Sequence, residues 1–241
     1  MKMTTITLFK IEPMPNKNDI IYRLHGKKKD GCWIKAKESK HNNNEVEIDV
    51  WYEEDIETGL KRAFSDEAYE VVEYLKTKGK EKIIRKVYCF IDLSLGTLEI
   101  YRGIDVITYK IKGVIEKLLK INLSTISLDA GHLMHIVKGY SSELKQAMFK
   151  YIHGLWYHII RGRHLEKNGK YKDFIVTKPD SLRCVSIVPK IKYLNGNGYS
   201  VTINGDKGTI KMWDGMFKWK PRLEVKQIVQ IVANVSALPS F

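Results

Sequence analysis

The sequence predicts an α+β fold in which antiparallel sheets pack against helices. Short apolar segments with a period of two alternate irregularly with segments that have a helical period. A regular succession of strand and helix would instead predict a parallel sheet. Turn sequences such as Asn204-Gly205 join neighbouring strand segments directly, which favours antiparallel hairpins.

The first 54 residues are predicted to form a small antiparallel sheet. Residues 3–11 are rich in threonine and isoleucine, which is typical of a strand. Residues 20–24 and 32–36 flank a segment of glycine and lysine, and we expect a hairpin with a basic tip at Lys27-Lys28-Lys29. In residues 45–52, Val46, Ile48, Val50 and Tyr52 alternate with Glu45, Glu47, Asp49 and Trp51, as in a half-buried strand.

The next segments predict two helices around a second hairpin. Ser65 is a suitable N-cap for a helix that Gly79 would end. Residues 87–91 and 97–101 predict the two strands of the hairpin. An apolar stripe within residues 107–118 predicts the helix that follows it.

Residues 126–194 predict a mixture of strands and helices. Residues 126–128 predict a short strand, and apolar side chains at mixed spacings of three and four predict helix over residues 131–153. Gly139 is expected to divide this helical stretch into two. Residues 155–160 and 182–194 predict strands on either side of a polar, basic loop.

The end of the chain repeats an earlier pattern. Residues 199–203 and 209–213 predict a hairpin, and Pro221 begins a final helix. With an offset of 112 residues, segment 89–103 aligns without a gap to segment 201–215. After an insertion of two residues, the apolar stripes of the following helices align as well. The echo predicts two duplicated strand-hairpin-helix (ββα) units.

Two such units around a pseudo-two-fold axis resemble the saddle of TATA-box-binding proteins, in which each half ends in a hairpin and a helix. The residues that carry the resemblance are paired by the offset: Gly96-Thr97 with Gly208-Thr209, and Tyr101 with Trp213. The resemblance is one of architecture and carries no diagnostic motif.

Charge divides the chain into two parts. Residues 1–80 hold 15 basic and 15 acidic side chains, so the whole formal net charge of +13 belongs to residues 81–241. We therefore predict an electroneutral, sheet-rich module with one helix in residues 1–80. Residues 81–241 are predicted to be a basic α+β module with two hairpin-helix units. An uneven positive charge of this kind favours a polyanionic partner.

Composition excludes several classes of protein. Among the 241 residues, 44% are hydrophobic, which supplies a core, but the apolar runs are too short to span a bilayer. We expect no membrane contact and no signal peptide. The three cysteines form no C-x-x-C pair, which argues against disulfides and a zinc site and favours a reducing, cytoplasmic location. We expect no cofactor and no bound metal.

The leading functional hypothesis is a non-enzymatic protein that binds nucleic acid, either DNA or RNA. Cations interleaved with aromatic side chains are the composition that phosphates and bases require. Two segments of the basic module have it, and the side chains expected to contact nucleic acid are Trp156, Arg161, Arg163, His164, Lys167, Lys170, Lys172, Lys207, Lys211, Lys218, Trp219, Lys220 and Arg222.

Two alternatives belong to other classes. The basic part could instead dock on an acidic protein, as an inhibitor or accessory subunit of a nucleoprotein complex does, and residues 1–80 are a second candidate surface for a protein partner. The third hypothesis is a magnesium-dependent nuclease with Asp92 and Asp129 as ligands. The position of Asp92, between an apolar strand and a returning strand, resembles the opening of RNase H-like nucleases. The simpler interpretation makes Asp92 a turn residue and Asp129 a helix N-cap.

Overall fold

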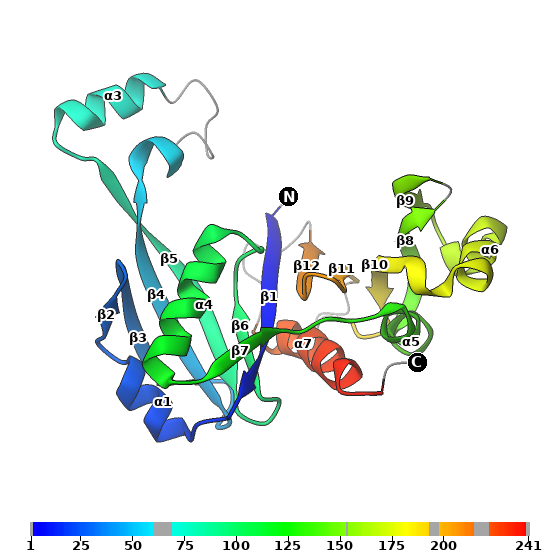
Figure 1. The fold of residues 1–241 in the computed structure, drawn as a ribbon, viewed down its shortest axis with the longest axis horizontal. Helices are drawn as coiled ribbons and strands as arrows, with labels where there is room; N and C mark the ends of the chain where they lie inside the picture. The colour runs from blue at the N-terminus through cyan, green and yellow to red at the C-terminus, as the bar shows by residue number, and fades with distance from the viewer. Residues whose placement is uncertain (1, 60–68, 153, 193–197, 215–221, 240–241) are drawn as a thin grey trace.

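The computed structural model describes residues 2–59, 69–152, 154–192, 198–214 and 222–239. Within these residues, twelve strands form one open antiparallel sheet, and helices pack against both of its faces (Figure 1). The α+β class with antiparallel pairing is confirmed. The strands are β1 (Lys2–Glu12), β2 (Lys28–Lys29), β3 (Cys32–Glu38), β4 (Glu45–Asp55), β5 (Lys82–Asp92), β6 (Thr97–Ile100), β7 (Asn122–Thr125), β8 (Ser141–Ile152), β9 (Leu155–Arg161), β10 (Leu182–Pro189), β11 (Ser200–Asn204) and β12 (Thr209–Asp214).

The order of strands across the sheet is β2-β3-β4-β5-β6-β1-β12-β11-β10-β8-β9. Strand β1 is therefore central, with β6 on one edge and β12 on the other. Strand β7 continues the edge that β12 occupies, because it pairs with the last residues of β1. The helices are α1 (Lys17–Leu24), α3 (Tyr69–Thr77), α4 (Val106–Leu119), α5 (Ala130–Tyr140), α6 (Gly169–Thr177) and α7 (Arg222–Ser236), with 3-10 turns η2 (Leu165–Lys167) and η3 (Pro179–Ser181).

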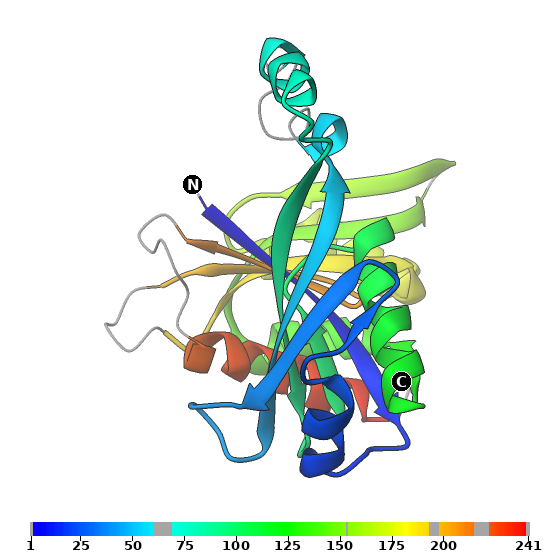
Figure 2. The same cartoon turned by 90° about the vertical axis from the view of Figure 1, so that its left-hand side faces the viewer.

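Side chains of β1 enter two separate cores. Successive side chains of a strand point to opposite faces of the sheet. Ile6 and Leu8 join a cluster with α5, α6 and α7, whereas Phe9 and Ile11 join a cluster with α1 and α4. The two cores therefore lie on opposite faces. One covers the half of the sheet from β3 to β6, and the other covers the half from β12 to β8 (Figures 1 and 2).

Two strand-strand-helix segments flank β1. Strands β5 and β6 form a hairpin followed by α4, and β11 and β12 form a hairpin followed by α7. Both β6 and β12 run antiparallel to β1. Since α4 and α7 belong to the two different cores, each helix covers a different face of the sheet.

The predicted first hairpin is wrong in its first strand, whereas residues 32–36 form part of strand β3 as predicted. Residues 20–24 belong to α1, which begins where the side chain of Asn16 accepts a hydrogen bond from the backbone N–H of Asp19. Such N-capping satisfies an amide that the helix cannot, and it outweighs the β-propensity of the isoleucines. The actual hairpin is short: β2 pairs with β3 around Asp30 and Gly31, which both have positive φ. Lys28 and Lys29 of the predicted basic tip thus form β2, and Lys27 precedes it.

The predicted helix over residues 131–153 ends early. Helix α5 stops at Tyr140, and the remainder is strand β8. Leu144 and Met148 are four residues apart, a spacing that fits one helical turn. In β8 they lie on opposite faces, Leu144 in the core and Met148 at the open-face groove, because the pairing register shifts between Leu144 and Gln146. The predicted strand at residues 126–128 lies just after the observed strand β7 (Asn122–Thr125), so the prediction is displaced by a few residues toward the C-terminus.

The other predicted elements are confirmed, and their bounds differ by a few residues. Ser65 and Pro221 lie outside the described residues, so the starts predicted for two helices are not observed. The sheet continues across residue 80, because β4 and β5 pair along eleven residues. The two predicted modules thus share one sheet, and their division at residue 80 stays a prediction from charge. No helix within the described ranges is long and apolar enough to cross a bilayer.

Candidate nucleic-acid interface

One face of the second half of the sheet carries polar and basic side chains. We call it the open face: the side of β12, β11, β10, β8 and β9 that lies opposite the core of α5, α6 and α7. Along β12, Ile210 and Met212 are buried in that core, so Lys211 and Trp213 point to the open face. None of the helices within the described residues has an apolar side packed against it.

A groove of about 320 Å³ crosses the open face next to β1. Hydroxyl and amide side chains make up much of its lining, and Gly103 and Ile104, which precede α4, form one rim. Thr202 donates a hydrogen bond to Ser186 at 3.0 Å between neighbouring strands. The lining residues are Thr5, Gly103, Ile104, Gln146, Met148, Cys184, Thr202, Asn204, Lys207, Thr209 and Lys211. Hydroxyl and amide groups of this kind donate hydrogen bonds to phosphate and sugar oxygens.

Cations stand along the same face. Lys207 and Lys211 line the groove and are exposed to solvent. The Nζ of Lys145 donates to the hydroxyl of Ser200 at 3.2 Å, and the Nε of Arg161 donates to the side-chain oxygen of Gln146 at 2.8 Å. These bonds fix two positive charges on the sheet without neutralising them.

Negative charge on this side comes from the β11–β12 turn and from Glu143 of β8, which directly precedes the core residue Leu144 and so points to the open face. Asp206, between β11 and β12, is paired with Lys150 and lies 3.5 Å from the Nε of Arg183. The hydrogen bond to Asp206 raises the pKa of Lys150 above its ordinary value. Lys150 and Arg183 are therefore partly compensated, and the available positive charge of the face resides on Lys145, Arg161, Lys207 and Lys211.

The structure separates the predicted binding residues into groups. Arg161, Lys207 and Lys211 share the open face. Lys167, Lys170 and Lys172 are exposed around α6, and the core residues Tyr171 and Phe174 place α6 on the opposite side of the sheet. Arg163 and His164 are exposed in the turn after β9. Lys218, Trp219 and Lys220 lie outside the described residues.

Trp156 lies on the other face of β9 from Arg161. His158 and Ile160 of that strand approach the core on the α6 side, and the rings of His158 and Phe174 are 4.9 Å apart. Alternation along the strand gives Trp156 the same side as these two residues. Tyr157, Ile159 and Arg161 point to the open face, where Tyr157 pairs with Lys150.

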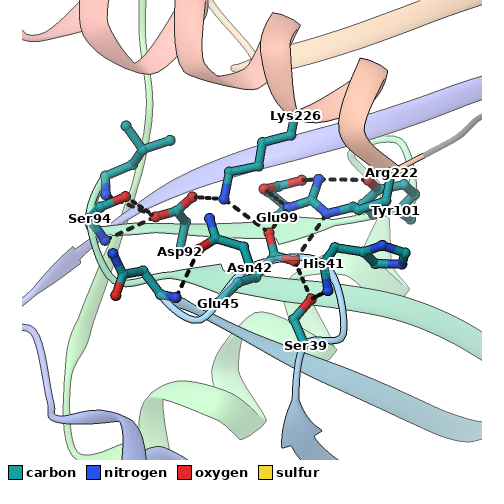
Figure 3. A network of polar contacts seen from close by, with 12 residues as sticks. Ser39, His41, Asn42, Glu45, Asp92, Ser94, Glu99, Tyr101, Arg222 and Lys226 are labelled. Carbon is teal, nitrogen blue, oxygen red and sulfur yellow. Dashed lines mark hydrogen bonds and ion pairs between the residues drawn. The ribbon is translucent and has the colours of Figure 1, made fainter. Parts of the chain in front are cut away.

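Arg222 is the predicted binding residue that the structure removes from any surface. It begins α7, is buried, and its guanidinium lies between two glutamates of the first half of the sheet (Figure 3). It donates to the two carboxylate oxygens of Glu99 at 2.7 and 2.8 Å and also to Glu45. The hydroxyl of Tyr101 accepts a further hydrogen bond from this guanidinium at 3.0 Å. All five N–H donors of Arg222 are therefore used within the protein, so its expected role in binding phosphate needs correction.

A second cation of α7 completes this buried charge cluster, which we define as Glu45, Asp92, Glu99, Arg222 and Lys226. The Nζ of Lys226 lies 2.8 Å from a carboxylate oxygen of Asp92 and 3.6 Å from one of Glu45 (Figure 3). Burial raises the pKa of Glu99, against the opposing effect of Arg222. Burial also tends to raise the pKa of Asp92, but hydrogen bonds from Lys226 and Ser94 outweigh it, and the net shift is downward.

Asp92 and Asp129 both have structural roles. Asp92 also accepts backbone hydrogen bonds from Ser94 and Leu95 in the β5–β6 turn. Asp129 caps α5 by accepting from the backbone N–H of His132 at 2.8 Å. The interpretation of the two aspartates as turn residue and N-cap is thus confirmed. In the part of the chain that the structure describes, no group of three or more His, Cys, Asp or Glu side chains is placed so that it could hold a metal ion.

Sequence reasoning missed several open-face residues, among them Lys145, Gln146 and Thr202. The first two lie in a stretch predicted to be helix, so the sequence did not indicate on which face of a strand their side chains lie. The signal for Thr202 was present in the alternation of residues 199–203, whose hydroxyl side chains oppose the apolar ones.

Comparison with protein-family models finds no match for the chain, and no curated protein matches it in sequence.

Proposed function

We propose that the protein binds nucleic acid through the open face. The observation that carries the proposal is the set of cations on one side of the sheet, Lys145, Arg161, Lys207 and Lys211, beside a groove lined by hydroxyl and amide groups. Each lysine or arginine that meets a phosphate releases condensed counterions, which supplies affinity independent of sequence. Hydroxyl and amide donors then position the backbone.

The arrangement around β1 supports a second proposal, that the two ββα segments are a duplicated unit. The 112-residue offset pairs positions with matching places in their hairpins: Gly96 and Gly208 both have positive φ in the turn. Glu99 of β6 corresponds to Lys211 of β12. The charge at this position is reversed between the two units, and the side chains face opposite sides of the sheet.

The test is fluorescence anisotropy with labelled DNA and RNA, single-stranded and duplex, at about 50 and 200 mM salt. We expect binding that weakens about tenfold or more over this step, because several phosphates are neutralised. Replacing Lys207 and Lys211 together by alanine should lower affinity about tenfold. The slope of log affinity against log salt concentration should become less steep by roughly the value of one phosphate contact or more.

The matched control is Lys170→Ala with Lys172→Ala, which removes the same charge from α6 on the other side of the sheet. This control should bind as the unmodified protein does. Equal losses in both double variants would show that net charge, not the open face, carries the binding. Absence of binding at low salt would overturn the proposal and favour an acidic protein as the partner of the basic surface.

A further inference from the structure

We propose that the open face takes a single strand of nucleic acid in preference to a duplex, with Trp213 and Tyr157 as stacking platforms at its two ends. This inference rests on the proposed function and specifies its ligand. The chemistry shared by single-stranded RNA and DNA, unpaired bases on a phosphate chain, is what the face fits. The two sugars are separate arms of the test.

The two aromatic side chains share the open face with the cations. Trp213 follows Lys211 by two residues on β12, and 37% of it is exposed. Tyr157 precedes Arg161 by four residues on β9, and 53% of it is exposed. Residues two or four apart on a strand point to the same side. Aromatic faces attract bases that are not already paired and stacked in a duplex.

The surface between the platforms is a sheet whose groove is lined largely by hydroxyl, amide and basic side chains. A helix or a two-stranded ribbon reads the major groove of a duplex, and proteins that bind the minor groove frequently insert apolar wedges between base steps. The groove of about 320 Å³ is near the lower limit of small-ligand pockets. It admits part of one strand but not the width of a duplex.

The spacing indicates a short binding site. From β12 to β9 the order is β12-β11-β10-β8-β9, so about 20 Å separates the outer strands at roughly 4.8 Å per step. Lys145 and Arg161 lie within this width, on β8 and β9. We therefore expect a site near the short end of the range of about 4–16 nucleotides known for single-strand binders.

The experiment uses the whole protein and unlabelled competitors of equal length: single-stranded RNA, single-stranded DNA and duplex, each displacing a labelled single strand. Either single strand should compete at least about tenfold better than duplex. Trp213→Ala and Tyr157→Ala should each lower single-strand affinity about five- to tenfold without changing the salt slope, since stacking neutralises no phosphate. Tyr157→Phe should retain affinity because the ring remains.

Trp156→Ala is the matched control, because Trp156 is 73% exposed on the same strand but points to the other face. It should bind normally. If duplex competes as well as single strands, or if Trp156→Ala weakens binding as much as Tyr157→Ala, this inference is overturned while the proposed function stands. If no nucleic acid binds, both are lost.

Discussion

The polar faces of the two halves of the sheet differ in burial: the first is covered by a helix, and the second is exposed. In the first half, Glu45, Asp92 and Glu99 line the face that turns away from the core of α1 and α4. Helix α7 covers them with Arg222 and Lys226, so five charged side chains are buried together. In the second half, Lys207 and Lys211 line the corresponding face and stay exposed.

The difference fits our proposal that one hairpin pattern serves stability in one place and recognition in another. Acids in the first half are satisfied by cations from the same chain, because leaving a buried carboxylate unpaired is costly. Cations in the second half face a groove and solvent, which leaves their charge available to an external anion. Glu99 and Lys211, which the offset of 112 residues pairs, carry opposite charges and show this contrast at one aligned position.

The largest effect is expected from Arg222→Met. Removing the guanidinium leaves Glu45 and Glu99 buried without their main partner, and the free energy of unfolding should fall by about 3–5 kcal/mol in urea denaturation. Adding Glu45→Gln and Glu99→Gln to this variant should restore part of the loss, because no uncompensated charge then remains. Lys170→Met on exposed α6 should change stability by less than about 0.5 kcal/mol. A comparably small change for Arg222→Met would contradict the role of the cluster.

Lys211→Glu gives the second hairpin the charge of the first and should separate recognition from stability. The side chain is exposed, so the melting temperature should stay within about 2 °C of the unmodified protein. Affinity for single-stranded nucleic acid should fall by more than it does in Lys211→Ala, because repulsion of the phosphates replaces attraction. Lys172→Glu on α6 is the control of equal charge change. Unaltered affinity in Lys211→Glu would remove this lysine from the interface.

A smaller contrast is expected between two buried cysteines. Burial raises the pKa of the Cys184 thiol to about 11 and also raises the pKa of Cys89. A raised pKa lowers the thiolate fraction at pH 8, so both should alkylate slowly and faster as the pH rises. Cys184 lines the groove and is 5% exposed, whereas Cys89 lies in the core under α4. Mass spectrometry should show Cys184 modified first, and a bound strand should slow it alone. Equal rates at the two cysteines would contradict an accessible groove.

Several elements could be predicted from the sequence because their signal is local. The alternation of residues 46–52, the turn at Asn204-Gly205 and the apolar stripe after Ile107 each describe a strand, a turn or a helix face completely. Prediction failed where two local signals compete. Asn16 caps a helix whose isoleucines favour a strand, and Leu144 and Met148 have a helical spacing although a register shift in β8 places them on opposite faces.

The candidate site was predictable only in part. Lys207, Lys211 and Arg161 were singled out by charge, and they do lie on one face. Arg222 was singled out by the same criterion but is buried, because its partners Glu45 and Glu99 are more than a hundred positions away in the chain. Charge counts do not reveal such pairing. Lys145 and Gln146 were missed because they belong to strand β8, which the sequence predicted to be helix.

The sequence by itself determined the class of fold, the two hairpin-helix segments and the excess of positive charge in the second part of the chain, since these depend on periodicity, turn residues and composition. Tertiary structure decided which charges are available. Strand β1 places the two units on its opposite edges and their helices on opposite faces, and α7 carries Arg222 and Lys226 across to the acids of the other unit. A charge acts on a ligand only where burial and pairing leave it free, and both depend on contacts between distant segments.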